Sequence, residues 1–215
     1  MRFPVESLKP TKIVCVGTNY RDHAKELGMD IPGEPLIFLK PVSSIIYDSQ
    51  EIVLPRGVTR LDYEAELAVV IKEEARRIEE KDVPGHILGY TCLNDVTARD
   101  LQKKDGQWTR AKSFDTFCPV GPWVETDIDP LNVKVESYLN GDLKQSSNTR
   151  ELIFTVNRLV SFISGVMTLR PGDIISTGTP YGVGPMQPGD IIEIRIEGIG
   201  SLKNKVVESN PLTLP

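Results

Sequence analysis

Short apolar stretches separated by turn residues run through the whole chain and predict more strands than helices. Apolar runs rich in Val and Ile, five to ten residues long and bounded by Gly, Pro, Asn or Asp, are typical of strands. They predict strands at residues 12–17, 36–40, 43–54 with a break near Asp48, 63–72, 133–139, 174–177, 191–196 and 202–207.

Three turn signals support this interpretation. Asn140-Gly141 lies between two strand-like segments and predicts a tight hairpin. Pro171-Gly172-Asp173 and Pro188-Gly189-Asp190 have the same sequence, and each is followed at once by an apolar strand-like run. The sequence therefore predicts antiparallel strands joined by short connections.

Helical patterns are fewer. Residues 19–27 have helical character, residues 96–102 follow a potential capping residue, and residues 151–164 place apolar side chains on one side. Together the elements predict a β-rich α+β fold whose mixed sheets are rolled into a barrel or a sandwich. We expect residues 1–55 to form a small N-terminal lobe and residues 56–215 to form the main domain.

Composition and charge limit the class of protein. The chain has 215 residues, 40% of them hydrophobic, and a net charge of −5 without a basic cluster, so nucleic acid is not an expected partner. Its apolar runs are too short to span a membrane, and its N-terminus lacks a signal-peptide core. Cys15, Cys92 and Cys118 lack metal-site spacing, which favours buried thiols and a cytoplasmic protein.

Two glutamates one residue apart are the most informative chemical feature. Glu64 and Glu66 precede the apolar run 67–71, and alternate residues of a strand share one face. Two buried carboxylates this close repel each other unless water, a shared proton or a cation neutralises them. A divalent cation is the sharpest of these hypotheses, and a solvated strand end is the alternative.

Further candidates follow along the chain. Asp95 follows an apolar strand, where it is either a helix cap or a third carboxylate ligand, and Arg99 and Gln102 lie four and seven residues later. Their convergence suits an anionic ligand, although a surface Asp–Arg pair has the same spacing. Lys112 lies among aromatic and small residues, where it is either a buried cation that stabilises an enolate or a surface lysine.

Two more segments carry possible chemistry. His23 and Glu26 are three residues apart on a predicted helix, so the carboxylate can orient the imidazole as a general base, or both can be exposed. The segment 177–185 is rich in glycine but lacks the lysine of a phosphate loop. Its backbone N–H groups, including that of Gly178, and the Thr179 hydroxyl can still bind a carboxylate.

The potential metal ligands are carboxylates, and neither Cys nor His occurs at ligand spacing. Oxygen ligands favour hard cations, so Mg²⁺ or Mn²⁺ is expected, with Ca²⁺ possible and Zn²⁺ disfavoured.

Several motifs in combination resemble the fumarylacetoacetate hydrolase family, specifically its short acylpyruvase-like branch. The resemblance extends from residue 12 to the C-terminal strands and rests on the segments 38–41 (FLKP), 62–67 (DYEAEL), 94–100 (NDVTARD), 111–115 (AKSFD), 177–180 (TGTP) and 182–184 (GVG). It implies a β-rich roll and a homodimer.

The resemblance also implies roles for residues. Glu64, Glu66 and Asp95 match the family's metal ligands, and Lys112 matches its catalytic lysine. Residues that match its substrate pocket are Lys40, Arg99, Gln102 and Thr179. His23 and Glu26 match a catalytic pair on a lid.

The reaction implied first is hydrolysis of the C–C bond of an acylpyruvate through a pyruvate enolate. Decarboxylation or keto–enol tautomerisation of oxaloacetate, and isomerisation of 2-hydroxyhepta-2,4-diene-1,7-dioate, use the same kind of site. A non-catalytic protein that retains the fold is the alternative of another class.

Overall fold

The structure is a computed structural model and describes residues 1–26 and 31–209, apart from the side chains of residues 23, 24 and 26. Its strands form three sheets. The large sheet has the order β1 (Arg2–Pro4), β10 (Cys118–Glu125), β8 (Ile87–Asn94), β7 (Ala65–Ile71), β13 (Ile174–Ser176), β2 (Ile13–Gly17) and β3 (Leu36–Lys40), and β4 (Ile45–Ile46) pairs with β10. The second sheet has the order β12 (Asp142–Asn148), β11 (Lys134–Leu139), β15 (Ile191–Ile196), β16 (Gly200–Glu208) and β5 (Glu51–Leu54). The small third sheet contains β14 (Gly184–Met186), β6 (Leu61–Tyr63) and β9 (Thr97–Ala98).

The sheets are mixed. Most neighbours are antiparallel, but β2 pairs with β13, β4 with β10 and β5 with β16 in parallel. The β-rich α+β architecture is therefore confirmed. Among the described residues the sheets stay open, so a barrel-like closure is not confirmed. The lobe boundary at residue 55 and the homodimer stay predictions.

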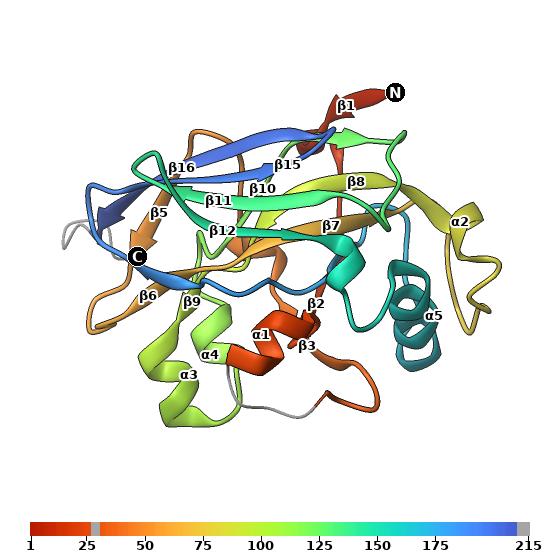
Figure 1. Cartoon of the computed structure of the whole chain (residues 1–215), viewed down its shortest axis with the longest axis horizontal. Helices are drawn as coiled ribbons and strands as arrows, with labels where there is room; N and C mark the ends of the chain where they lie inside the picture. The colour runs from red at the N-terminus through yellow and green to blue at the C-terminus, as the bar shows by residue number, and fades with distance from the viewer. Residues whose placement is uncertain (27–30, 210–215) are drawn as a thin grey trace.

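The second sheet lies against one face of the large sheet, and most of the helices lie below both sheets in the view of Figure 1. Leu67, Val69 and Ile71 of β7 face the core between the two sheets, whereas Ala68 and Val70 face a second apolar cluster. Because residues alternate along a strand, Glu66 points to the same side as Ala68, away from the second sheet. The buried apolar side chains of the helices at 83–86 and 156–166 belong instead to the core between the two sheets.

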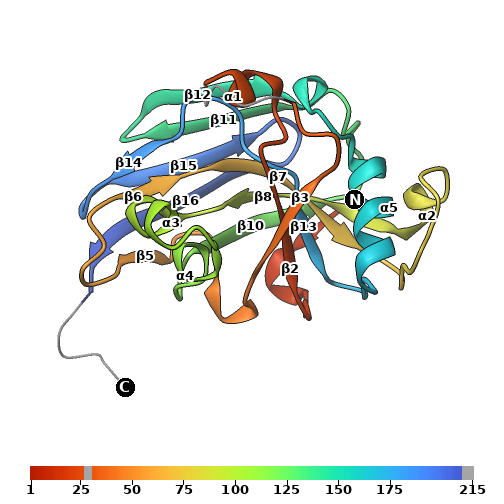
Figure 2. The same ribbon diagram turned by 90° about the horizontal axis from the view of Figure 1, so that it is seen from below.

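The helices are short except the last. They are α1 (Arg21–Glu26), α2 (Val83–His86), α3 (Arg99–Asp105), α4 (Thr109–Lys112) and α5 (Val156–Val166), with 3₁₀ turns at Val5–Ser7, Val42–Ser44 and Thr149–Glu151. Seen from below, α3 and α4 lie side by side near β6, and α5 lies beside α2 (Figure 2).

The expected helices exist but begin later than predicted. The helix expected at 151–164 begins at Val156, because Thr155 caps it by accepting the N–H of Arg158, and a 3₁₀ turn occupies Thr149–Glu151. The helix expected at 96–102 begins at Arg99, since Thr97 and Ala98 pair with β6. In both cases the residues before the helix are used in other local structure.

The predicted turns are confirmed. Asn140 and Gly141 have positive φ angles of 54° and 89° and join β11 to β12. Gly172 and Gly189 have φ angles of 88° and 99° in the two Pro-Gly-Asp turns before β13 and β15. The three cysteines are buried and free, as expected.

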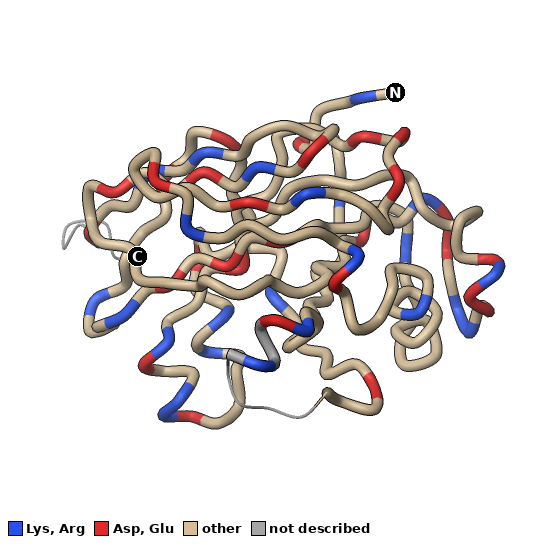
Figure 3. Tube along the Cα trace, viewed as in Figure 1, with Lys and Arg blue, Asp and Glu red and all other residues tan. Residues whose placement is uncertain are grey.

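Lys and Arg are interspersed with Asp and Glu along the trace in Figure 3, which agrees with the absence of a basic cluster in the sequence. No helix among the described residues is long and apolar enough to cross a membrane.

Asp173→Ala is expected to destabilise the protein by about 3 kcal/mol, because it leaves several part-buried donors without their acceptor. The Asp173 carboxylate accepts the N–H groups of Thr11, Lys12 and Arg170 and pairs with the Lys12 ammonium. Burial alone raises the pKa of Asp173, but these donors outweigh it and lower the pKa. The stabilisation is therefore complete above the unfolded pKa, near 4, and is lost as the pH falls through the folded pKa.

Urea unfolding at pH 7 and in acid measures this effect, and the difference between wild type and variant should shrink in acid. Asp190→Ala, in the second Pro-Gly-Asp turn, is the matched control. Asp190 accepts from the Gln187 N–H and from Asn140 at the surface, so its loss should cost only about 1 kcal/mol. Equal losses for both variants would contradict the role assigned to Asp173.

Candidate active site

The expected continuous strand at 63–72 is wrong at one position, because the chain leaves regular strand geometry at Glu64 between β6 and β7. The backbone groups at this break have specific partners. Asn94 accepts the N–H of Glu64 at 2.9 Å, Gln145 accepts the N–H of Ala65 at 3.0 Å, and the Glu64 carbonyl accepts the N–H of Asp95 at 2.9 Å. The break lets β6 join the small sheet while β7 stays in the large one.

Three carboxylates meet beside this break. Glu64, Glu66 and Asp95 are 6%, 1% and 1% exposed, and one oxygen from each lies within 4.8 Å of the others. Three buried negative charges this close are unfavourable without compensating positive charge. The predicted convergence of these side chains is thus present in the fold.

Lysine and arginine side chains compensate two of the three carboxylates. The Lys112 ammonium bridges Glu64 and Asp95 at 2.8 and 2.6 Å, Lys40 pairs with the other Asp95 oxygen, and Arg99 pairs with Glu64. Burial alone raises the pKa of Glu64, but Lys112 and Arg99 outweigh it and lower the pKa well below its usual value. Glu64 is therefore a carboxylate at neutral pH.

Glu66 has a different environment. Its Oε2 accepts from the Ser176 hydroxyl and from the N–H of Gly178 at 2.8 Å, and no ion pair reaches it among the described residues. Burial and the neighbouring charges of Asp95 and Glu64 raise its pKa to about 8. Its Oε1 makes no hydrogen bond to the described part of the chain, so it is open to a cation.

This donor set fits a hard divalent cation. All three side chains offer oxygen, which Mg²⁺ and Mn²⁺ prefer, and a bound cation would favour the charged form of Glu66. Glu64, Glu66 and Asp95 are the residues that would bind the ion.

Lys112 is a buried cation and not a surface lysine. It is 2% exposed at the end of α4, and its ammonium lies 5.0 Å from the centre of the Phe38 ring. Burial alone lowers the pKa of Lys112, but Asp95 and Glu64 outweigh it and raise the pKa above its usual value. The ammonium is therefore charged throughout the neutral range, which makes it a source of positive charge and not a base.

Asp95 does not cap α3, which corrects one of the two sequence interpretations. The N-cap position is Ala98 and has no side-chain hydrogen bond, while the Asp95 carboxylate is bound to Lys40 and Lys112. Arg99 and Gln102 do share a face of α3, and Arg99 donates to the Gln102 amide oxygen at 2.7 Å.

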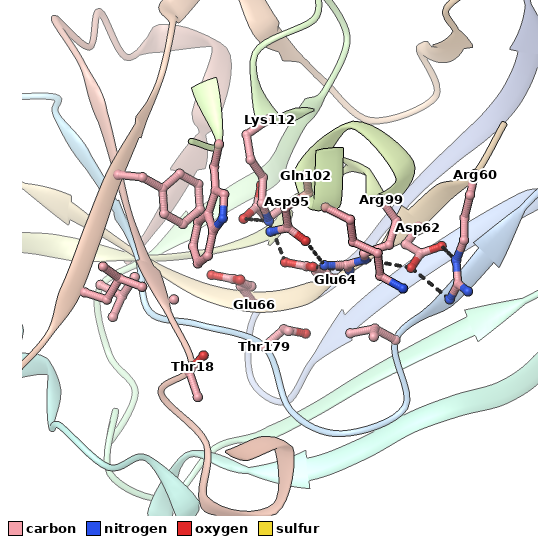
Figure 4. Close-up of a pocket in the computed structure, with 17 residues that line it drawn as sticks. Thr18, Arg60, Asp62, Glu64, Glu66, Asp95, Arg99, Gln102, Lys112 and Thr179 are labelled. Carbon is pink, nitrogen blue, oxygen red and sulfur yellow. Dashed lines mark hydrogen bonds and ion pairs between the residues drawn. The ribbon is translucent and has the colours of Figure 1, made fainter. Parts of the chain in front are cut away.

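These groups line a pocket of about 480 Å³ (Figure 4). Its polar side carries the charged residues already described, and its apolar side is formed by Val16, Leu36, Phe38 and Trp108. Phe38 and Trp108 pack edge to face with ring centres 5.2 Å apart. The close approach of Trp108 favours glycine at position 17, since a Cβ there would lie 2.8 Å from the Trp108 ring.

A family model described as "Fumarylacetoacetate (FAA) hydrolase C-terminal" matches residues 12–207, which is most of the chain. The chain belongs to the fumarylacetoacetate hydrolase family. The resemblance seen in the sequence motifs is thereby confirmed.

Similar proteins in this family include named enzymes. A protein of Methanocaldococcus jannaschii is 59% identical over 202 residues, which are 94% of this chain and 85% of that protein. The mitochondrial oxaloacetate tautomerase of Xenopus laevis is 44% identical over 210 residues, 92% of this chain and 66% of that protein. The crystal structure of 5-carboxymethyl-2-hydroxymuconate delta-isomerase from Mycobacterium smegmatis is 48% identical with a TM-score of 0.89, covering 94% of this chain and 81% of that one. The chain is accordingly an enzyme of the fumarylacetoacetate hydrolase family.

The other predicted site residues differ in position. Thr179 lines it, and its hydroxyl donates to the Ala65 carbonyl at 3.0 Å. Lys40 is 1% exposed behind Asp95, and the Gly178 N–H is used by Glu66. His23 and Glu26 belong to α1, as predicted for a helical pair, but their side chains lie outside the described residues.

Several residues that position the site were missed. Gln145 of β12 accepts from Ala65 and donates to Thr179 at 2.9 Å, and Asp62 accepts from both Arg60 and Arg99. Asp62 has a sequence signal, since it is one step earlier in the alternation that contains Glu64 and Glu66. Gln145 has none, because only the packing of the two sheets brings it to the break.

Proposed function

We propose that this protein is a Mg²⁺- or Mn²⁺-dependent enzyme that acts on 2-oxo acids through an enolate. The observation that supports this most is the group of three buried carboxylates with one ammonium between two of them, at the bottom of a pocket that has further cationic groups. Such an arrangement suits a reaction in which an oxygen atom of the substrate gains negative charge.

Glu64, Glu66 and Asp95 would hold the ion, which would supply Lewis-acid stabilisation of that charge. The other roles in the reaction belong to side chains of the protein. Lys112 keeps its proton at neutral pH, so its ammonium adds a fixed positive charge beside the reacting atoms. Arg99 and Gln102 offer N–H donors to a substrate carboxylate from α3.

The apolar side of the pocket has a complementary role. Phe38 and Trp108 reduce the access of water to the enolate, which strengthens the electrostatic interactions with Lys112. Thr179 lines the side of the pocket opposite these two rings.

Keto–enol tautomerisation of oxaloacetate is the reaction we place first. The tautomerase of Xenopus laevis and the isomerase of Mycobacterium smegmatis both carry names for proton-transfer reactions. Tautomerisation needs proton movement at a stabilised enolate and no activated water.

Hydrolysis of an acylpyruvate is the second candidate. It requires a group that activates water, and the i,i+3 placement of His23 and Glu26 on α1 favours it. Oxaloacetate decarboxylation and isomerisation of 2-hydroxyhepta-2,4-diene-1,7-dioate pass through the same kind of enolate and stay alternatives. A non-catalytic role is disfavoured, because three buried carboxylates destabilise a fold that gains nothing from them.

With Mg²⁺ or Mn²⁺ present, the enzyme is expected to accelerate the decay of the ultraviolet absorbance of enol oxaloacetate without forming pyruvate. Coupled detection of pyruvate separates decarboxylation from tautomerisation, and acetylpyruvate replaces oxaloacetate in a parallel assay for hydrolysis. A chelator should abolish any of these activities. If neither compound is turned over with either metal, the enolate proposal is overturned.

A further inference from the structure

Thr18 has a backbone conformation that a threonine rarely adopts. Its φ angle of 53° lies in the left-handed region, where the branched Cβ of a threonine is crowded by its own backbone. Other residues besides glycine with a positive φ in the described ranges are Ser49, Arg77, Thr116 and Asn140. Of this group, Thr18 is the one that lines the pocket with the three carboxylates. Backbone strain of this kind gathers at functional sites.

The segments on both sides of Thr18 are held in place. Gly17 pairs with Leu36 of β3 at the end of β2. The buried Asn19 side chain donates to the Phe154 carbonyl at 3.1 Å and accepts the N–H of the same residue at 2.8 Å. The chain therefore has to turn at position 18, and a glycine would make this turn without the steric cost. The turn alone does not explain the threonine side chain.

The hydroxyl of Thr18 makes no hydrogen bond to the described residues, unlike that of Thr179. The Thr179 hydroxyl donates to the Ala65 carbonyl at 3.0 Å and accepts from the Gln145 amide at 2.9 Å. Because a hydroxyl has one proton to donate, Thr179 has none left for a ligand. Figure 4 shows both threonines on the side of the carboxylates opposite Lys112. On this side of the pocket, the free hydroxyl donor is therefore that of Thr18.

Thr116 has a similar backbone conformation but a different use of its hydroxyl. Its φ angle is 72°, and its Oγ1 accepts the N–H of Val53 at 2.9 Å. That bond satisfies a backbone group of β5, which gives Thr116 a structural reason to be a threonine. Thr116 does not line the pocket. Thr18 has no such backbone partner among the described residues, and its side chain borders the cavity instead.

We propose that the Thr18 hydroxyl donates a hydrogen bond to a carboxylate oxygen of the substrate. This proposal rests on the proposed function, in which the 2-oxo acid group lies at Glu64, Glu66 and Asp95. Lys112 supplies positive charge from the opposite side, so a donor at Thr18 fixes the orientation of the acid between them. The fixed segments on either side hold this hydroxyl in place before the ligand arrives, which reduces the entropy lost on binding.

The test uses oxalate, which resembles the enolate of pyruvate, in the presence of saturating Mn²⁺. Thr18→Val keeps the branched shape and removes the hydroxyl, so calorimetry should show an affinity for oxalate about tenfold lower than that of the wild type. Thr18→Ser retains the hydroxyl and should stay within about threefold of the wild type. The Mn²⁺ affinity without oxalate, and the urea midpoint, should be the same in Thr18→Val and the wild type.

Thr18→Gly separates stability from binding. Glycine adopts the left-handed conformation without steric cost, so the urea midpoint should rise while oxalate affinity falls as in Thr18→Val. Thr116→Val is the matched control. It should lower the urea midpoint, because the Val53 N–H loses its acceptor, and should leave oxalate affinity unchanged to within about twofold.

Three results would overturn the assignment of Thr18. They are wild-type affinity for oxalate in Thr18→Val, equal losses in Thr18→Val and Thr18→Ser, and a loss of Mn²⁺ affinity in Thr18→Val that accounts for the whole change. If the wild type binds no oxalate with either Mn²⁺ or Mg²⁺, the proposed function fails and this assignment fails with it. That outcome is distinct from a failure at Thr18 alone, in which the wild type binds oxalate normally.

Discussion

Glu66→Gln is expected to lower kcat/KM for the 2-oxo acid substrate by about 10³-fold and to weaken Mn²⁺ binding. The substitution preserves the size of the side chain, and its amide oxygen can still accept from Ser176 and Gly178. What it removes is the negative charge that Glu66, the only carboxylate in the trio without an ion pair to the described residues, would carry with a cation bound. Without that charge, the site should bind a divalent cation more weakly.

Calorimetric titration with Mn²⁺ and steady-state kinetics measure the two effects together. Glu136→Gln is the matched control, because Glu136 is a buried strand glutamate outside the pocket whose ion pair is with Lys134. It should change kcat/KM less than about twofold, as expected for a substitution away from the site. Unchanged Mn²⁺ affinity in Glu66→Gln would contradict the assignment of Glu66 as a ligand.

Local sequence patterns predicted much of the fold because the relevant interactions are local. Asn140-Gly141 specifies its own turn through the positive φ angles of both residues. The two Pro-Gly-Asp turns likewise determine where β13 and β15 begin. The alternation of Glu64 and Glu66 was enough to predict that both point into one site, even though the strand was expected to be continuous.

The errors arise where residues distant in sequence decide the structure. The break at Glu64 depends on Asn94 and Gln145, which lie 30 and 80 residues from the N–H groups that they accept. The pattern of residues 63–72 alone does not predict it. Asp95 was ambiguous between cap and ligand until the positions of Lys40 and Lys112 were known. Long-range contacts therefore determine which of several local interpretations is realised.

Lys112→Met is expected to separate the structural role of this ammonium from its catalytic role. Methionine has a similar length, but it removes the ammonium from beside the Phe38 ring and leaves Glu64 and Asp95 facing each other without the charge between them. Removing one partner of a buried ion pair costs about 3–5 kcal/mol. In metal-free buffer the variant should therefore unfold at a much lower urea concentration than the wild type.

Mn²⁺ should restore most of that stability but little of the activity. A divalent cation bound to the three carboxylates replaces the lost positive charge, so the stability gained on adding Mn²⁺ should be larger for Lys112→Met than for the wild type. The ammonium beside the reacting atoms is still missing, and kcat should stay lower by about 10²–10³-fold. Urea unfolding with and without Mn²⁺, paired with kinetics at saturating Mn²⁺, measures both.

Lys81→Met is the control for the loss of a lysine charge. Lys81 and Glu79 form an exposed pair, so this variant should lose less than about 1 kcal/mol and should not respond differently to Mn²⁺. If Mn²⁺ restored both stability and kcat in Lys112→Met, the ammonium would serve only to neutralise Glu64 and Asp95 in the absence of the ion. If it restored neither, the carboxylates would not bind the ion without Lys112. Only stability without turnover agrees with an ammonium that acts on the substrate beside a separate cation.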